Sequence, residues 1–278
     1  YREDIMIPLP DLVVCSRYCQ EQAHLADLIH RQLKVPIITV DLTPPQKESE
    51  FEERVRYVER QIREEAIPSL ERAVGKRFDY DRLSEIVDIL KKCATLRNEC
   101  LDVAKSVPSP WTLIDMCVSI APVMYLMGKP GTIEYYVKLK EELKERVAKK
   151  IPAVLPEEKY RLYWDNYIMW GWLGPLSRKV ASYGGNMLVG RYPYLMFPHP
   201  ESLDPENPIY SVADQLMRWM LPQGLPQFAR KLLGQFVEDF SLDGLIMLSS
   251  PTCRLFDMGQ QDILDEMGLA AKPTLTLL

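Results

Sequence analysis

The chain of 278 residues has no apolar run long enough to span a membrane, which takes about 18–20 consecutive apolar residues. Its longest apolar stretch, Val118 to Met127, is broken by Ser119 and Pro122. The six cysteines are too few for a disulfide scaffold in a chain of this size, which indicates a reducing compartment. No charged segment followed by an apolar one marks the N-terminus as a signal peptide. We therefore expect a cytoplasmic protein without a membrane segment.

Several binding motifs are also missing. The chain has no G-x-x-x-x-G-K-[ST] segment, which excludes ATP binding through a P-loop, and no G-x-G-x-x-G segment, which weakens a nicotinamide-binding interpretation. Acidic residues outnumber basic ones, 39 to 34, and the net charge is −5. Because no basic stripe could follow a phosphate backbone, we expect no nucleic-acid partner.

The hydrophobic pattern is typical of a soluble α/β protein with a helical insertion. Residues 11–42 predict strand, helix and strand, the helix spanning about 20–33. Residues 43–150 predict helices only, including one that Asp81 caps and one that begins at Ser109-Pro-Trp-Thr and runs through Met116 to Met127. From 151 onwards strands and helices alternate again, with a proline-rich loop over 192–208.

We divide the chain into three parts on this pattern. Residues 1–42 form part of an N-terminal α/β lobe, 43–150 a helical region and 151–278 a C-terminal α/β lobe. Residue 1 is tyrosine and the last residues form an apolar run. We therefore expect the N-terminal lobe to be truncated upstream and the C-terminal lobe downstream.

Two apolar strands lead into cysteines. Leu12-Val-Val14 precedes Cys15 and Cys19, and Leu245-Ile-Met-Leu248 precedes Cys253. Ligands bind beyond the carboxyl ends of strands in open α/β sheets, and a thiolate there is a candidate metal or cluster ligand. Helix-forming residues follow both sites, and helix N-termini favour anions. The C-x₃-C spacing alone is a weak signal, so these cysteines are equally compatible with a structural role.

Four segments in this order resemble the 2-hydroxyacyl-CoA dehydratase and benzoyl-CoA reductase family. They are Asp11-Leu-Val-Val-Cys-Ser-Arg-Tyr-Cys19 with Val35-Pro-Ile-Ile-Thr-Val-Asp41, Arg161-Leu-Tyr-Trp-Asp165 with Trp170-Gly171, Asp243-Gly-Leu-Ile-Met-Leu-Ser-Ser-Pro-Thr-Cys-Arg254, and Gly259-Gln-Gln-Asp262 with Pro273-Thr-Leu. The resemblance implies two flavodoxin-like lobes with doubly wound parallel sheets, flanking a helical insertion. It also implies pairing with a homologous second subunit.

The resemblance further implies a [4Fe–4S] cluster held by three cysteines, with one iron position open. Cys19 and Cys253 match two of the family's ligands, Cys15 is a neighbour and weaker metal candidate, and the third ligand is expected upstream of residue 1. The chain would then be an iron–sulfur subunit of an enzyme of anaerobic metabolism that acts on an acyl-CoA or aryl-CoA. Its electrons would come from an ATP-hydrolysing activator protein.

Three functions stay open at this point. We favour benzoyl-CoA-reductase-like reduction of an aryl-CoA thioester through a ketyl radical, the chemistry of an oxidoreductase. The alternative is a lyase subunit that dehydrates an (R)-2-hydroxyacyl-CoA. The third is a homologous scaffold subunit that is not catalytic.

Further candidate residues lie near these segments. Trp164, Asp165 and Trp170 could line an acyl pocket or fill the core, and Arg191 could bind a CoA phosphate or form a surface salt bridge. Arg254 could donate a hydrogen bond to cluster sulfur, and His199 could act as an acid–base group or be an exposed loop residue.

Overall fold

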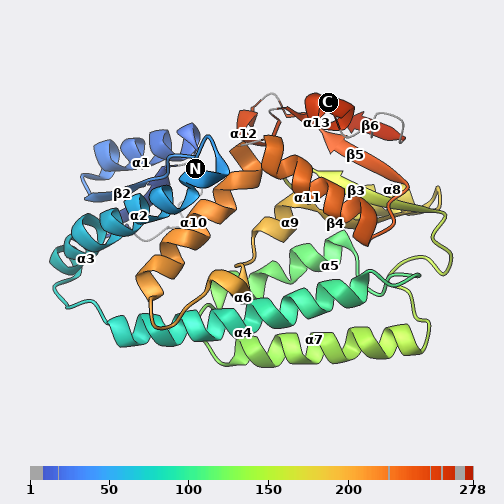
Figure 1. Cartoon of the computed structure of the whole chain (residues 1–278), viewed down its shortest axis with the longest axis horizontal. Helices are drawn as coiled ribbons and strands as arrows, with labels where there is room; N and C mark the ends of the chain where they lie inside the picture. The colour runs from blue at the N-terminus through green and yellow to red at the C-terminus, as the bar shows by residue number, and fades with distance from the viewer. Residues whose placement is uncertain are drawn as a thin grey trace.

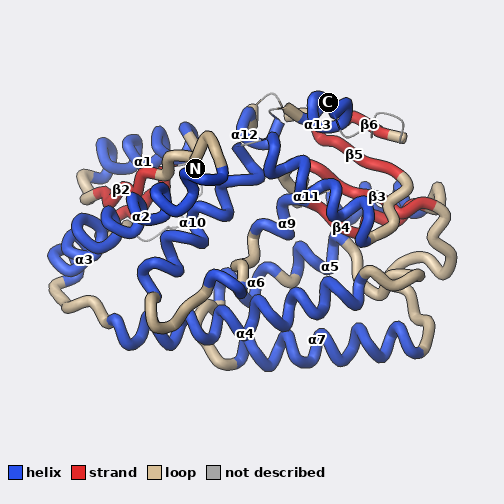
Figure 2. The backbone as a smooth tube through the Cα atoms, viewed as in Figure 1, coloured by secondary structure: helices blue, strands red, loops and turns tan. Residues whose placement is uncertain are grey.

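The computed structural model describes residues 9–17, 19–224, 226–250, 252–257, 259–266 and 273–277. Strands gather in two separate places, with helices between and below them (Figure 2). All strand pairs in the described residues are parallel, so the α/β class expected from the sequence is confirmed. In this part of the chain no helix is long and apolar enough to cross a membrane.

The N-terminal sheet is a single βαβ unit. It consists of β1 (Val13–Arg17), α1 (Gln20–Leu33) and β2 (Ile37–Asp41), and Val13 pairs with Ile37 in the parallel register. The strand is longer than the apolar run predicted: Cys15 lies inside β1 rather than after it. Hydrogen bonds to β2 override the low apolar content of 15–17.

Residues 43–150 contain helices joined by loops. The helices are η1 (Glu48–Glu50), α2 (Phe51–Gln61), the π-helical turn η2 (Ile62–Ala66), α3 (Ile67–Val74), α4 (Tyr80–Ala104), α5 (Leu113–Val118), α6 (Ile120–Tyr125) and α7 (Gly131–Ala148). The long helices α4 and α7 pack along each other at the lower edge of the molecule (Figure 1).

Two details of the helical region differ from the prediction. Asp79, not Asp81, caps α4, because its carboxylate accepts the backbone N–H of Arg82 at 2.8 Å. The helix predicted over Ser109–Met127 starts only after Thr112, which forms a capping box with Asp115, and it is interrupted at Ser119. Local side-chain hydrogen bonds therefore set boundaries that the apolar pattern does not show.

The C-terminal sheet has the strand order β4-β3-β5-β6. The strands are β3 (Tyr160–Asp165), β4 (Gly185–Gly190), β5 (Gly244–Leu248) and β6 (Thr274–Leu277). The helices of this part are α8 (Leu173–Ala181), α9 (Arg191–Leu195), η3 (Pro200–Ser202), α10 (Pro208–Gly224), α11 (Pro226–Asp239), α12 (Arg254–Asp257) and α13 (Gln260–Glu266). The stretch predicted as a proline-rich loop thus contains two short helices.

Helix α10 joins the N-terminal sheet to the C-terminal part. Its buried Ala213 and Met217 share a core cluster with Val40 of β2 and with Val55 and Val58 of α2. The same helix also contacts α12 (Figure 1). The two segments that carry Cys19 and Cys253 are therefore linked through one helix.

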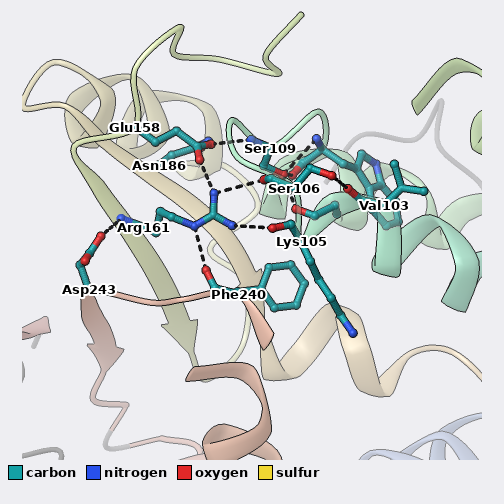
Figure 3. Close-up of polar contacts among 11 residues, drawn as sticks. Val103, Lys105, Ser106, Ser109, Glu158, Arg161, Asn186, Phe240 and Asp243 are labelled. Carbon is teal, nitrogen blue, oxygen red and sulfur yellow. Dashed lines mark hydrogen bonds and ion pairs between the residues drawn. The ribbon is translucent and has the colours of Figure 1, made fainter. Parts of the chain in front are cut away.

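A buried arginine ties the amino end of β3 to its surroundings (Figure 3). Arg161 is 5% exposed, and its guanidinium forms an ion pair with Glu158. It also donates to backbone carbonyls, which belong to Lys105, Ser106 and Phe240. Glu158 in turn accepts from the Ser109 N–H at 3.0 Å and the Asn186 amide at 2.6 Å. Because these partners come from the end of α4, from β4 and from the end of α11, the cluster fixes the helical region against the sheet.

Candidate functional site

The candidate site lies at the carboxyl ends of β3 and β5. The chain passes from β3 to β4 on one side, and then to β5 on the other side of β3. In open parallel sheets such a reversal of strand order leaves a crevice where ligands bind. The segment after β5 carries Cys253, and the residues after β3 support it.

Asp165 is the centre of the polar cluster beneath that segment. It is the last residue of β3 and is 4% exposed. One carboxylate oxygen accepts from the Tyr163 hydroxyl at 2.8 Å, and the other accepts from Arg191 at 2.9 Å and from the Gln260 amide at 2.6 Å. A buried carboxylate needs such donors to offset its lost hydration. Asp165 therefore joins β3, α9 and α13.

Arg191 begins α9, directly after β4. Its Nη2 donates to Asp165 and to the carbonyl oxygen of Phe256 at 2.6 Å, and both side chains of the ion pair are buried. Of the two interpretations offered for Arg191, the structure shows a salt bridge, but inside the molecule rather than on its surface. Gly190 precedes it, and a Cβ there would lie 2.8 Å from the Trp164 carbonyl oxygen. This close approach explains why glycine ends β4.

Asn166 carries the chain away from β3 with a left-handed backbone, φ 79°. Asparagine adopts this conformation more readily than most residues. Its amide nitrogen donates to the Leu248 carbonyl at 2.7 Å and to Asp257 at 3.1 Å. Since Asn166 has no exposed surface, these bonds hold the end of β5 and α12 against the end of β3.

The segment that carries Cys253 is closed by Asp257. This carboxylate accepts the Ser250 N–H at 2.7 Å and the Ser249 hydroxyl at 3.2 Å. The Cys253 N–H donates to the Ser250 carbonyl at 3.0 Å, and the Cys253 carbonyl accepts the N–H of Asp257 at 3.2 Å. The backbone around the half-buried Cys253 thiol is therefore held from both sides.

Cys19 lies at the other predicted thiol site. It stands at the N-cap position of α1, with an extended backbone, and its thiol is free and half-buried. Cys15 is buried, its thiol donates to the Gln22 carbonyl at 3.8 Å, and burial raises its pKa. Helix α1 has 14 residues, whereas α12 has four, so the helix-dipole argument applies to Cys19 and hardly to Cys253.

The tryptophans after β3 have different environments. Trp164 is 1% exposed and donates its indole N–H to the Tyr167 carbonyl at 3.1 Å, so it fills the core. Trp170 is 57% exposed and its ring lies 6.4 Å from that of Tyr192. The Tyr192 ring is in turn 6.1 Å from Phe256 of α12. An aromatic row thus runs from the surface to the Cys253 segment.

His199 lines a pocket of about 290 Å³ between α4, α6, α10 and the segment after α9. Its Nδ1 lies 3.3 Å from a carboxylate oxygen of Glu201, and burial lowers its pKa below the ordinary 6.5. His199 is thus partly buried, and it is not a hydrogen-bond neighbour of Asp165. The Arg254 side chain lies outside the described part of the structure.

The thiols suit a cluster chemically, but they do not complete one. Thiolates are the usual ligands of iron–sulfur clusters, and Cys19 and Cys253 are both free and half-buried. Among the described residues, no group of three or more histidine, cysteine, aspartate or glutamate side chains is placed to hold a metal ion.

Sequence reasoning missed part of the cluster beneath Cys253. Asn166 and Asp257 lie outside the quoted segments, and Tyr163 lies within Arg161–Asp165 but had no assigned contact. The roles of all three depend on which strands are adjacent. Gln260 lies in the Gly259-Gln-Gln-Asp262 segment but had no assigned contact. A signal was present for Asn166, since asparagine directly after a buried strand favours a left-handed turn.

Comparison with known proteins places the chain in a family. A family model described as "2-hydroxyglutaryl-CoA dehydratase, D-component" matches residues 4–277. The (R)-2-hydroxyisocaproyl-CoA dehydratase alpha subunit of Clostridioides difficile is 30% identical over 194 residues, which are 69% of this chain and 47% of that protein. The (R)-phenyllactyl-CoA dehydratase alpha subunit of Clostridium sporogenes is 26% identical over 193 residues, again 69% of this chain and 47% of the relative.

One subunit of the benzoyl-CoA reductase of Thauera aromatica is 26% identical over 268 residues, 91% of this chain and 61% of the relative. The chain thus spans between 47% and 61% of the length of these three relatives. The family match covers nearly every residue, including the Asp165 cluster and both thiol sites. The chain belongs to the 2-hydroxyglutaryl-CoA dehydratase D-component family, and its relatives include subunits of 2-hydroxyacyl-CoA dehydratases and of benzoyl-CoA reductase.

Proposed function

We propose that this chain is an iron–sulfur subunit of an acyl-CoA enzyme, with Cys19 and Cys253 as two of the ligands of a [4Fe–4S] cluster. The observation that carries the proposal is the placement of Cys253 over a buried polar cluster at the reversal of strand order, where parallel sheets bind ligands. The order β4-β3-β5-β6 follows the pattern of flavodoxin-like sheets, which supports a flavodoxin-like C-terminal lobe.

A bound cluster would supply single electrons at low potential and an iron able to bind a substrate oxygen. The chain's own residues would hold it in place. Asp165, Arg191 and Asn166 fix the ends of β3, β4 and β5, and Asp257 fixes the backbone on either side of Cys253. Rigid support of this kind keeps a ligand in position when the charge of the bound group changes.

We assign His199 the role of a proton acceptor in the same enzyme. Glu201 beside Nδ1 holds the ring proton there and leaves Nε2 with its lone pair. Burial lowers the His199 pKa, so the ring is neutral near pH 7 and able to accept a proton. Dehydration of a 2-hydroxyacyl thioester removes a C3 proton together with the hydroxyl, and reduction of an aryl ring takes up protons.

Two reactions fit the family. The match to the benzoyl-CoA reductase relative over 91% of the chain favours reduction of an aryl-CoA, whereas the higher identity to a dehydratase alpha subunit favours removal of water from an (R)-2-hydroxyacyl-CoA. Both proposals include a homologous second subunit and an ATP-hydrolysing activator. A scaffold subunit without catalysis is the remaining proposal.

Product analysis tests these proposals. The full-length protein, its partner subunit and the activator would be supplied anaerobically with benzoyl-CoA or with a 2-hydroxyacyl-CoA. A dienoyl or an enoyl thioester as product decides between the two reactions. A complex that keeps its activity when Cys253→Ser is introduced into this chain would identify the chain as a scaffold.

A further inference from the structure

The pocket that His199 lines is walled almost entirely by hydrocarbon. Its lining includes Leu90 of α4, Met124 of α6, and Val212, Leu216 and Trp219 of α10. Among the described lining residues there is no aspartate, glutamate, lysine or arginine. Burying an uncompensated carboxylate against such walls is strongly unfavourable, whereas burying alkyl or aryl groups is favourable.

The polar atoms of the pocket are largely used by the protein itself. The Gln215 amide oxygen accepts the backbone N–H of His199 at 2.7 Å. The Gln215 amide nitrogen donates to the backbone carbonyl of His199 at 3.2 Å and to the Ser202 hydroxyl at 2.5 Å. The other polar side-chain groups among the described lining residues are the His199 ring, with Nδ1 beside Glu201, and the indole N–H of Trp219. A ligand here would therefore meet mainly apolar walls, with one imidazole and one indole N–H.

The pocket borders the elements that hold the Cys253 segment. Arg191 at the start of α9 donates to the Phe256 carbonyl, and Leu195 at the end of the same helix lines the pocket. The two residues are four positions apart in the helix, which is about 6 Å at a rise of about 1.5 Å per residue. Helix α10 both lines the pocket and contacts α12. The pocket and the Cys253 segment thus share α9 and α10 as neighbouring elements.

One nearby cation offers a competing interpretation. Arg97 is 1% exposed, and its Nε and Nη2 have no hydrogen-bond partner in the described structure. Its guanidinium carbon lies 4.4 Å from the centroid of the Phe197 ring, and Phe197 lines the pocket. Arg97 is not itself a lining residue. Its guanidinium stacks on the Phe197 ring, and this ring rather than the cation forms the pocket wall.

We propose, on the basis of the function proposed above, that this pocket binds the acyl part of the substrate and selects an uncharged branched-aliphatic or aryl group. A carboxylate-bearing group such as glutaryl is excluded. The volume of about 290 Å³ suits such a group, since a cavity of about 150 Å³ already encloses benzene. Acyl selectivity then comes from α4 and α10 rather than from the segments that carry Cys19 and Cys253.

Binding of neutral amides tests this directly, because an amide keeps the acyl carbonyl and does not depend on turnover. Titration calorimetry on the full-length protein with its partner subunit would use 4-methylpentanamide, 3-phenylpropanamide and 5-amino-5-oxopentanoate. We expect the first two to bind at least about tenfold more tightly than the third, the scale of pocket discrimination between acyl groups. Equal or tighter binding of 5-amino-5-oxopentanoate, or no binding of any amide, would overturn the proposal.

Two valines give a matched pair of variants. Val212 and Val237 are both half-buried helical residues, but only Val212 lines this pocket. Val212→Phe should weaken binding of the two apolar amides at least about tenfold, and Val237→Phe should leave it within about twofold. Thermal unfolding of each variant checks that it is folded, and Leu216→Ala, which enlarges the pocket, replaces Val212→Phe if that variant does not fold.

An Arg97→Met variant addresses the competing interpretation. If the cation binds a substrate carboxylate, the variant loses affinity for 5-amino-5-oxopentanoate, which contradicts the proposal. If the pocket is apolar as proposed, the preference for the apolar amides is unchanged. Failure of the proposed function would be distinguishable from this, because the protein would then contain no iron and form no product while still binding the amides.

Discussion

Replacing Asp165 by asparagine should destabilise the protein strongly. The carboxylate is 4% exposed and accepts hydrogen bonds from Tyr163, Arg191 and Gln260. In Asp165→Asn one carboxylate oxygen is replaced by an NH₂ group, which donates hydrogen bonds and would face one of the present donors. The Arg191 charge also loses its negatively charged partner. Breaking a buried ion pair from one side costs about 3–5 kcal/mol. At about 2–4 °C per kcal/mol for a chain of this size, the unfolding midpoint should fall by roughly 6–20 °C.

Two further variants make the measurement specific. Glu142→Gln removes an exposed i,i+4 partner of Arg146, a type of pair worth about 0–1 kcal/mol, so its midpoint should fall by at most about 4 °C. The double variant Asp165→Asn/Arg191→Met leaves no unpaired buried charge at this ion pair and should unfold at a higher temperature than Asp165→Asn. Thermal unfolding followed by circular dichroism gives all three midpoints. Equal midpoints for Asp165→Asn and Glu142→Gln would refute the account of the cluster.

Three other predictions follow from the site. Burial lowers the His199 pKa, so the unfolded state binds more protons below pH 6.5 and the free energy of unfolding falls as the pH drops through that value. In urea unfolding, His199→Gln should lose less of this free energy at acid pH than the unchanged protein. An equal loss in both proteins would contradict this. Asp257→Ala should speed alkylation of Cys253 by iodoacetamide, because Asp257 fixes the backbone around that thiol, whereas the exposed Asp262→Ala should leave the rate unchanged. Three other thiols should stay unlabelled in the folded protein at neutral pH, because burial raises their pKa to about 11 or 12; these are Cys93, Cys100 and Cys117.

The sequence predicted the order of elements well where the apolar pattern is regular. Helix α1 has the predicted bounds, and the strands that lead towards Cys19 and Cys253 exist as parallel pairs. The predictions failed where side-chain hydrogen bonds decide, as at the start of α4, which Asp79 caps, and at the start of α5, which Thr112 and Asp115 cap. Such contacts depend on single residues and leave no periodic signal.

The candidate site was only partly accessible from the sequence. The motifs located Cys253 and Asp165, but not that Asp165 would hold Arg191 inside the molecule or that Asn166 would reach Leu248 and Asp257. These contacts join the ends of different strands, and the strand order of the sheet determines which strands are neighbours. Pairing of distant segments is a property of the whole fold, which local patterns do not contain.

Iron and acid-labile sulfide content tests the central claim most directly. The full-length protein would be purified anaerobically with its partner subunit, alongside a matched preparation carrying Cys253→Ser in this chain. The account predicts about four irons and four sulfides for this subunit, the content of one [4Fe–4S] cluster, and their loss from the subunit in the Cys253→Ser preparation. Equal iron and sulfide in both preparations, or none in either, would contradict it.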